Sequence, residues 1–263
     1  MSLTLPHGPL SKQPARANYR IDGPGHRLFF ESFPRRVRAT FAGETVLDTR
    51  RGSLLHETGL LPQLYVPQQD VRTDLLTGTD THTRCPFKGD ASYWSVCVGA
   101  RSADDAAWAY ADPLDGVEWL RGHVAFYWGA MDAWYDEDEQ VHAHLRDPYH
   151  RVDVRDSSSR VRVSAFGELI ADTRRPKVLS ETGLPNRLYI PPEDVRQQYL
   201  EASAKRTACP YKGAAAYRTI RVGDKRLEDA AWVYDEPLEN ALKVRGHLCF
   251  LAEGVDVAAD DAD

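Results

Sequence analysis

Residues 160–175 read RVRVSAFGELIADTRR, and this stretch decides the fold that the sequence predicts. On either side of Phe166-Gly167-Glu168 the apolar and polar side chains alternate, which is the period of a β-strand with one buried face. Glycine at the break is typical of a tight turn between two antiparallel strands. We therefore expect a β-hairpin here and an equivalent one in the first half of the chain, with its turn at Ala42-Gly43-Glu44.

The last four residues of this stretch reveal an internal duplication. Asp172-Thr173-Arg174-Arg175 repeats Asp48-Thr49-Arg50-Arg51 at an offset of 172 − 48 = 124. With that one offset and no gap, residues 36–132 align with residues 160–256, and roughly 40 of the about 97 aligned positions are identical. A period this long indicates two copies of one globular domain rather than a solenoid.

The duplication also sets the expected domain boundaries. The match extends a little upstream, because Pro24, His26 and Arg27 find the same residues at positions 148, 150 and 151. An acidic run separates the two copies and a second acidic run ends the chain. We expect an N-terminal arm at 1–21, a first domain at 22–135, an acidic linker at 136–145, a second domain at 146–256 and an acidic tail at 257–263.

The rest of each copy reads as short strands with little helix. Further strand candidates fall at 64–66, 93–98, 106–110 and 123–127 and at the equivalent positions of the second copy. A short helix is expected from Pro191 toward Leu200, because proline and acidic residues occupy its first turn, and another after Pro113 and Pro237. The sequence thus predicts a mainly β protein, made of two tandem copies of a small antiparallel β domain with one or two short helices each.

Composition favours a cytoplasmic protein that is not inserted in a membrane. Charged residues make up 27% of the chain, and no apolar run approaches the ~20 residues of a membrane-spanning helix. The first residues carry proline and charge where a signal peptide needs an apolar stretch. Cys85 and Cys209 are equivalent positions and the other two cysteines have no counterpart, which is not a disulfide framework. A net charge of −6 disfavours nonspecific nucleic-acid binding.

The sharpest local motif is Cys-Pro-aromatic-Lys-Gly, at 85–89 and again at 209–213. Its proline and glycine fix a turn that carries a thiol and an amine three residues apart, and a nearby ammonium lowers the pKa of a thiol. Cys85 and Cys209 are therefore candidate nucleophiles. The alternative is a small buried cysteine in a turn whose lysine, Lys88 or Lys212, is solvated.

His123 and His247 follow Arg-Gly in both copies, at the start of a predicted strand. The next apolar positions, 124 and 126, are apolar again at 248 and 250, so we expect that face in the core and the histidines on the opposite face. A histidine placed there can act as a base, bind a ligand or fill a structural role.

Aromatic residues recur more densely than a small core requires. Trp108 and Tyr110 are two residues apart and so share a strand face. Together with Glu57, Lys88 and His123, such rings could line a pocket that stacks a planar ligand and anchors its polar groups, or they could be ordinary core and rim residues. The candidate ligand-binding residues are Glu57, Tyr65, Cys85, Lys88, Tyr93, Trp108, Tyr110 and His123, and in the second copy Glu181, Tyr189, Cys209, Lys212, Tyr217, Trp232, Tyr234 and His247.

Signatures of several enzyme classes are missing. There is no Walker loop, no Rossmann glycine pattern and no Gly-x-Ser-x-Gly elbow. A metal-dependent nucleotidyl transfer needs paired carboxylates, for which Glu57 with Asp105 and Glu181 with Asp229 are the nearest substitutes. Each copy repeats only one cysteine and has no CxxC, which argues against zinc. No metal and no cofactor is expected.

Four segments carry a family resemblance: ETGL at 181–184, CPFKGDASYWSV at 85–96, DAAWAY at 105–110 and GHVAFY at 122–127. They resemble the bacterial family catalogued as domain of unknown function 427 (DUF427), over both copies and nearly the whole chain. The resemblance implies a compact β-rich fold similar to β-tent domains such as that of cereblon, without their zinc-binding cysteine pairs. A catalogue label on the family implies nucleotidyltransferase activity. Trp94-Ser95 becomes Arg218-Thr219 in the second copy, which leaves open whether both sites bind the same molecule.

The sequence supports one leading hypothesis and two alternatives. The leading hypothesis is a tandem protein that binds a small, partly planar molecule of unknown identity in aromatic-lined pockets. The second is an enzyme, either thiol-dependent through Cys85 or Cys209 or a nucleotidyltransferase as the family label implies. The third is an interaction module, in which the duplication provides two surfaces for a partner protein or a pseudo-twofold pair that mimics a homodimer. The chain is then a monomer with an internal pseudo-dimer, or a homodimer.

Overall fold

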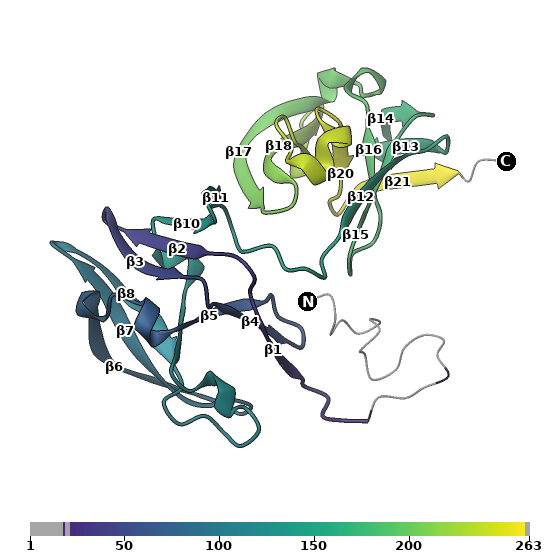
Figure 1. The fold of residues 1–263 in the computed structure, drawn as a ribbon. Helices are drawn as coiled ribbons and strands as arrows, with labels where there is room; N and C mark the ends of the chain where they lie inside the picture. The colour runs from purple at the N-terminus through teal and green to yellow at the C-terminus, as the bar shows by residue number, and fades with distance from the viewer. Residues whose placement is uncertain (1–17, 19–21, 261–263) are drawn as a thin grey trace. The chain divides into compact units, whose positions relative to one another are not determined.

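The computed structural model describes residue 18 and residues 22–260, and the chain divides into two compact units between Asp147 and Pro148 (Figure 1). Each unit contains one seven-stranded sheet and one smaller sheet. The strands of every sheet pair in antiparallel fashion. The prediction of two tandem, mainly β domains is therefore confirmed, and the units are called the first and second domain below.

In the first domain the strand order of the large sheet is β1-β4-β5-β9-β8-β7-β6 and that of the small sheet is β11-β10-β2-β3. The large sheet consists of β1 (Leu28–Ser32), β4 (Ser53–Glu57), β5 (Gln63–Pro67), β9 (His123–Phe126), β8 (Arg101–Ala109), β7 (Gly89–Val98) and β6 (Leu76–Cys85). The small sheet consists of β11 (Glu139–Val141), β10 (Ala133–Asp136), β2 (Val37–Phe41) and β3 (Glu44–Thr49).

The second domain repeats this plan, with the orders β12-β15-β16-β20-β19-β18-β17 and β14-β13-β21. Its large sheet consists of β12 (Val152–Asp156), β15 (Lys177–Glu181), β16 (Arg187–Ile190), β20 (Leu248–Phe250), β19 (Lys225–Val233), β18 (Gly213–Val222) and β17 (Leu200–Cys209). Its small sheet consists of β14 (Glu168–Thr173), β13 (Arg160–Ala165) and β21 (Val255–Asp260).

The hairpin that opened the sequence argument forms in both domains. Strand β13 pairs with β14 and β2 with β3, and each pair is joined by a two-residue turn. Both turn residues have positive φ, at 50° and 83° for Ala42 and Gly43 and at 55° and 85° for Phe166 and Gly167. Two left-handed residues in a row give the type of turn that matches the twist of antiparallel strands.

The Asp-Thr-Arg-Arg repeat that fixed the alignment has a structural role. Thr49 Oγ1 donates a hydrogen bond of 2.6 Å to Asp70 Oδ2, and the Arg51 guanidinium pairs with the same carboxylate. In the second domain Thr173 and Arg175 hold Asp194 in the same way. These bonds fix the end of a strand of the small sheet to the turn that follows β5 or β16.

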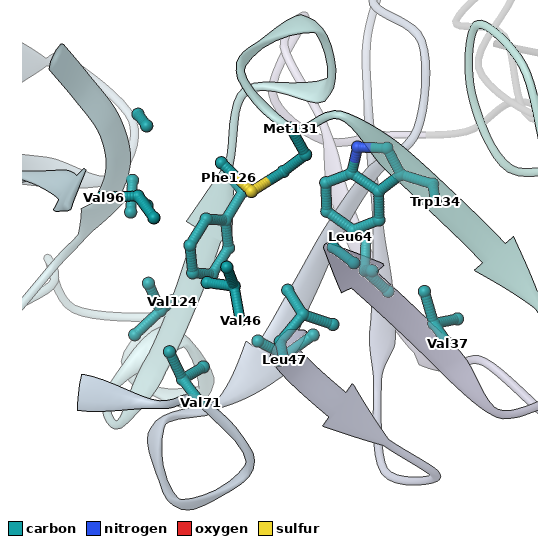
Figure 2. Packing of buried hydrophobic residues seen from close by; sticks show 14 of the residues in the cluster. Val37, Val46, Leu47, Leu64, Val71, Val96, Val124, Phe126, Met131 and Trp134 are labelled. Atoms are coloured by element: carbon teal, nitrogen blue, oxygen red, sulfur yellow. The ribbon is translucent and has the colours of Figure 1, made fainter. Parts of the chain in front are cut away.

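One face of each large sheet packs against the small sheet to form a core. Figure 2 shows side chains of the first domain converging from both sheets, with Val124 and Phe126 from β9 facing Leu47 from β3. Val46 and Val96 are fully buried among them. The face predicted to be apolar from positions 124 and 126 is therefore the core face, and His123 lies on the opposite side.

Among the residues that the structure describes, helical structure is limited to short 3₁₀ turns. These are η1 (Gln68–Asp70), η2 (Thr73–Leu75), η3 (Glu118–Leu120), η4 (Trp128–Ala130), η5 (Pro192–Asp194), η6 (Gln197–Tyr199) and η7 (Glu239–Val244). The helix expected from Pro191 toward Leu200 is two separate turns, because Val195 and Arg196 have extended or intermediate backbone angles between them. No helix in the described part of the chain is long and apolar enough to cross a membrane.

Two of the expected boundaries differ in the structure. The linker expected at 136–145 contains β11, which pairs with β10. The tail expected at 257–263 begins within β21, which pairs with β13 along its whole length. Val141 of the first segment packs against the core of its domain, and residues 257–260 of the second pair with β13, so an acidic composition did not mean that these segments lack strands. The arm predicted at 1–21, apart from residue 18, and the end of the tail lie outside the described residues.

Candidate functional site

The second face of each large sheet, opposite the face that packs on the small sheet, carries the predicted site residues and has its own cluster of buried side chains; we call it the outer face. In the first domain, strand register places four side chains in one line across neighbouring strands: Tyr93 pairs with Trp108, Trp108 with Ala125, and Ala125 with Tyr65. Because Ala125 is small, the Trp108 indole reaches over it and donates a hydrogen bond of 3.3 Å to the Tyr65 hydroxyl. We call these four residues the aromatic row.

The second domain has the same row. Tyr217, Trp232, Cys249 and Tyr189 occupy the equivalent positions, paired in the same order. Trp232 Nε1 donates to the Tyr189 hydroxyl at 3.0 Å, and the two rings meet edge to face with centroids 6.4 Å apart. The geometry therefore persists although cysteine replaces alanine at the centre.

In each domain, three segments of the chain bring charged side chains together. In the first domain Glu57 is 7% exposed and Lys88 8%, and the lysine ammonium donates to the Glu57 carboxylate. His26 Nε2 donates to the other carboxylate oxygen at 2.8 Å. The imidazole is stacked on the Phe87 ring, with centroids 3.7 Å apart and planes 10° from parallel. We call His26, Glu57 and Lys88 the carboxylate cluster.

The carboxylate cluster recurs in the second domain as His150, Glu181 and Lys212. His150 Nε2 donates to Glu181 Oε1 at 3.0 Å, and Lys212 donates to the other oxygen. The histidine stacks on Tyr211, with centroids 4.2 Å apart. Three residues from segments 31 positions apart thus meet in the same way twice.

Backbone hydrogen bonds explain how the cluster is positioned. Thr58, which follows Glu57, accepts a bond from the Arg27 backbone at its hydroxyl, at 2.9 Å, and donates its own backbone N–H to the Arg27 carbonyl. This double contact holds the residue after His26 beside the end of β4. The lysine is fixed by the following glycine, Gly89, whose φ of 108° only glycine adopts readily. The same Thr182–Arg151 contacts occur in the second domain.

The electrostatics of the cluster favour an ionised carboxylate. Burial of Glu181 raises its pKa, but the hydrogen bonds from His150 and Lys212 outweigh burial, so the net pKa is lowered. A carboxylate that receives two such bonds is stabilised in its charged form. The positive charge of Lys212 is therefore compensated locally.

The tyrosines near the cluster are held in their neutral form. Burial raises the pKa of Tyr110, and the proximity of Cys85, Tyr93 and Glu57 raises it further. In the second domain burial raises the pKa of Tyr234, with added contributions from Cys209, Glu181 and Tyr217. Tyr110 and Tyr234 are buried in the same side-chain clusters as the tyrosines of the aromatic row.

The remaining predicted residues also lie on or beside the outer face. Cys85 is partly buried against the aromatic cluster of the first domain, and Cys209 against that of the second. Tyr93 and Thr83 share a hydrogen bond of 2.9 Å. The ring of His123 meets that of Phe30 edge-on, with centroids 5.4 Å apart, and His247 forms a hydrogen bond to the Arg245 carbonyl.

The sequence-based site omitted His26 and His150. Both histidines match each other in the repeat, just upstream of the first expected strand. However, nothing in the spacing of the sequence indicates that His26 contacts Glu57, 31 residues later. Phe87 and Tyr211 were noted only as the aromatic position of the Cys-Pro-aromatic-Lys-Gly motif. Only the fold shows that this ring stacks on the histidine.

The structure places the lysines and acids of the enzyme alternatives in other contacts. The Lys88 ammonium pairs with the Glu57 carboxylate. In the thiol hypothesis this ammonium was instead expected to activate Cys85. Glu57 and Asp105 have separate partners, because Asp105 accepts hydrogen bonds from Thr79 and Thr81 at 2.6 and 2.7 Å. The arrangement can offer a planar ligand two things on one face: aromatic rings to stack on and a polar cluster to bond with.

Comparison with known families gives one match, found twice. The profile of the family described as NTP_transf_9, domain of unknown function (DUF427), matches residues 29–137 and again residues 153–261. A search of curated proteins gives no match.

Proposed function

Because both halves of this chain belong to the DUF427 family, we propose one function for both: each domain binds a small, partly planar molecule on its outer face. The half-buried indoles Trp108 and Trp232 supply the accessible part of the aromatic row on which such a molecule stacks, while Tyr65 and Tyr189 are buried beneath them. The carboxylate cluster supplies hydrogen bonds to its polar groups. The observation that carries the proposal is the recurrence of His26, Glu57 and Lys88 as His150, Glu181 and Lys212, in the same contacts.

The energetic cost of the cluster supports a role beyond stability. Removing a carboxylate and an ammonium from water costs several kcal/mol per ion, and replacing such a pair by apolar residues is often neutral or stabilising. A fold that needed only a filled space at Glu57 and Lys88 would be served as well by two apolar side chains. Charged groups held at the edge of an aromatic surface are typical of sites that orient a ligand.

The aromatic surface is partly open. Trp108 is half-buried, and Tyr127, whose ring centroid lies 4.6 Å from that of Trp108, is 49% exposed. Apolar aromatic area that stays exposed next to a polar cluster can stack a flat ring, with gains of about 0.5–1.5 kcal/mol per aromatic contact. The histidine of the cluster is also partly exposed, at 23% of its side chain in the first domain and 18% in the second.

Ligand-observed NMR tests the proposal. The full chain is incubated with a panel of planar heteroaromatic compounds, and saturation transfer identifies those that bind. We expect binders, and we expect the double variant Trp108→Leu with Trp232→Leu to weaken their affinity about tenfold or more, as loss of stacking and of one hydrogen bond predicts. Native mass spectrometry of the freshly purified chain, compared with its denatured mass, would identify a molecule that copurifies.

Tyr135→Leu is the matched control. Tyr135 is a half-buried aromatic residue on β10 of the small sheet, where it contacts Arg38. This variant should bind the panel as the unmodified chain does. Unchanged affinities in a folded Trp108→Leu, Trp232→Leu protein would refute binding on the aromatic row.

A further inference from the structure

The outer faces of the two domains differ in charge. Four basic side chains of the second domain stand where the first domain has uncharged ones. These are Lys177 for Ser53, Arg187 for Gln63, Lys205 for Thr81 and Lys243 for Trp119. Asp156 accompanies them, at the position of Ser32, and pairs with Lys177. The substitutions surround the aromatic row, whose three rings are the same in both domains, as are the three residues of the carboxylate cluster.

Contacts place these cations next to the row of the second domain. Lys205 Nζ lies 4.6 Å from the centre of the Tyr217 ring at one end. At the other end, Lys177 donates to one oxygen of Asp156, and Lys243 Nζ lies 3.9 Å from the other. One carboxylate thus faces two ammonium groups.

Arg187 completes this group of cations. It precedes Tyr189 by two positions on β16, so both side chains point to the outer face. Tyr189 pairs with Cys249 at the centre of the row, so Arg187 lies two positions along β16 from that pair. Burial raises the pKa of the Cys249 thiol to about 12, and the charges of Arg187 and Lys212 act in the opposite direction.

The first domain closes the same region with rings. Trp119 stacks on Phe30 with centroids 4.6 Å apart, and Phe30 meets Tyr65 edge-on at 6.1 Å. Val154 and Lys243 occupy the positions of Phe30 and Trp119 in the second domain. The end of the site that is apolar and aromatic in one domain is therefore cationic in the other.

We propose that the two sites are specialised: the second domain takes a planar ligand that carries an anionic group, a carboxylate or a phosphate, and the first takes an uncharged planar ligand. This inference rests on the proposed function, because it assumes that planar ligands bind on the outer face. Lys177, Arg187 and Lys243 are the groups that contact the anion. Charge-assisted hydrogen bonds from such groups are stronger than neutral ones, and they discriminate against an uncharged analogue.

The chain contains its own reporters for this test. Of its six tryptophans only Trp232 lies in the second domain, and Trp108 is its counterpart in the first. Their indole N–H signals are read in the full chain labelled with ¹⁵N-tryptophan and are assigned with Trp108→Phe and Trp232→Phe. The probes are 2-naphthoate and 2-naphthamide, which share one ring system and differ by one charge; naphthyl phosphate tests the second anion.

We expect 2-naphthoate to shift the Trp232 signal at concentrations at least about tenfold lower than it shifts Trp108, and 2-naphthamide to show the reverse order. If naphthyl phosphate shifts the Trp232 signal at a lower concentration than 2-naphthoate does, the anionic group is a phosphate. If 2-naphthoate acts at the lower concentration, it is a carboxylate. Equal response of both tryptophans to 2-naphthoate would overturn the specialisation and leave the proposed function intact. No response of either tryptophan to any probe would count against both.

A domain-matched variant tests the cations themselves. Lys177→Ser with Arg187→Gln gives the second domain the residues of the first at two positions. Its affinity for 2-naphthoate at Trp232 should fall about tenfold while its response to 2-naphthamide stays the same. In the unmodified protein, raising the salt concentration to about 0.5 M should weaken the binding of 2-naphthoate at Trp232 but not that of 2-naphthamide, because salt screens the attraction between the cations and the charged ligand. If neither the double substitution nor the added salt lowers the affinity for 2-naphthoate, the cations have no role in binding it. The salt experiment uses the unmodified protein and so holds even if the variant folds poorly.

Discussion

At the scale of single residues, Glu181 makes the stability of the second domain depend on pH in a known direction. Its ordinary pKa is 4.5, and hydrogen bonds from His150 and Lys212 lower the pKa in the folded state despite burial. A depressed folded-state pKa contributes stability above the unfolded value, and this contribution is lost as pH falls through the folded-state pKa.

We expect Glu181→Gln to destabilise the second domain by about 3 kcal/mol at pH 7, because Lys212 is left in a buried site without its counter-charge. The difference from the unmodified chain should shrink as the pH falls below 4.5, the ordinary pKa of the side chain, because the carboxyl of the unfolded chain is protonated first and the native one only below its lowered pKa. Urea unfolding at pH 7 and at pH 3.5–4, which is roughly where glutamates titrate, measures both values.

Glu193→Gln is the control for this change, since Glu193 is exposed and lies 3.5 Å from Arg175. Exposed pairs contribute about 0–1 kcal/mol, so little change is expected. Equal effects of the two substitutions would mean that the carboxylate cluster is not a buried ion pair in solution.

The cysteines provide a second residue-scale prediction. Burial raises the pKa of Cys249 to about 12, and the residue is 1% exposed. Because the thiolate is the reactive form, Cys249 should resist iodoacetamide at pH 9 in the folded protein, while the partly exposed Cys97 reacts. Peptide mass spectrometry quantifies each site, and denatured protein serves as the control in which both react. Labelling of Cys249 at the rate of Cys97 would show that the outer face opens.

The repeat made some site residues predictable and left others out. Glu57, Lys88 and Trp108 were selected because their types recur at one offset, and the structure places them on one face. His26 was not selected, because its contact with Glu57 depends on the pairing of β1 with β4, which no local pattern encodes. Long-range strand order is the part of the site that sequence periodicity does not contain.

At the scale of elements, the turn that carries Lys212 depends on glycine for two reasons. Gly213 has φ of 100°, and a Cβ there would lie 3.1 Å from the Glu236 carbonyl oxygen. We expect Gly213→Ala to cost about 2–3 kcal/mol, from backbone strain together with this clash. Thermal unfolding gives the loss, and the Trp232 signal reports whether the outer face changes with it.

Gly223 separates the two causes. It also has positive φ, at 59°, but a Cβ there meets nothing within 4 Å. Gly223→Ala should therefore cost only about 1 kcal/mol. If both substitutions have the same effect, the close approach to Glu236 has no energetic weight.

The hairpins were predictable because turn and strand signals are local, as in residues 160–175. The irregularities in the longest strands were not. Strands β7 and β8 lose register between Trp94 and Val96, where Asp105 adopts positive φ of 48°. Asp229 does the same in the second domain, with φ of 53°. An aspartate tolerates that backbone better than most residues, but its place in an alternating run gave no sign of a bulge.

At the scale of the whole molecule, each domain has its own core, and we expect each half to fold alone. Residues 1–147 and 148–263, expressed separately, should each show cooperative thermal unfolding and a β-type circular dichroism spectrum. Equimolar mixing should leave both transitions unchanged. A half that unfolds when isolated, or a mixture with a higher transition than either half, would instead favour the interaction module, in which the copies stabilise each other.

The position of the histidine in the carboxylate cluster bears on how the gene was duplicated and on how the protein can be trimmed. His26 and His150 each lie three residues before the segment that the family profile matches, at 29 and 153. The ancestral unit that was copied therefore extended upstream of the profile, far enough to include this residue. A first-domain fragment cut at residues 29 and 137 would lose His26 of the carboxylate cluster, the first residue of β1 and all of β11, so a fragment meant to keep the cluster has to begin before residue 26.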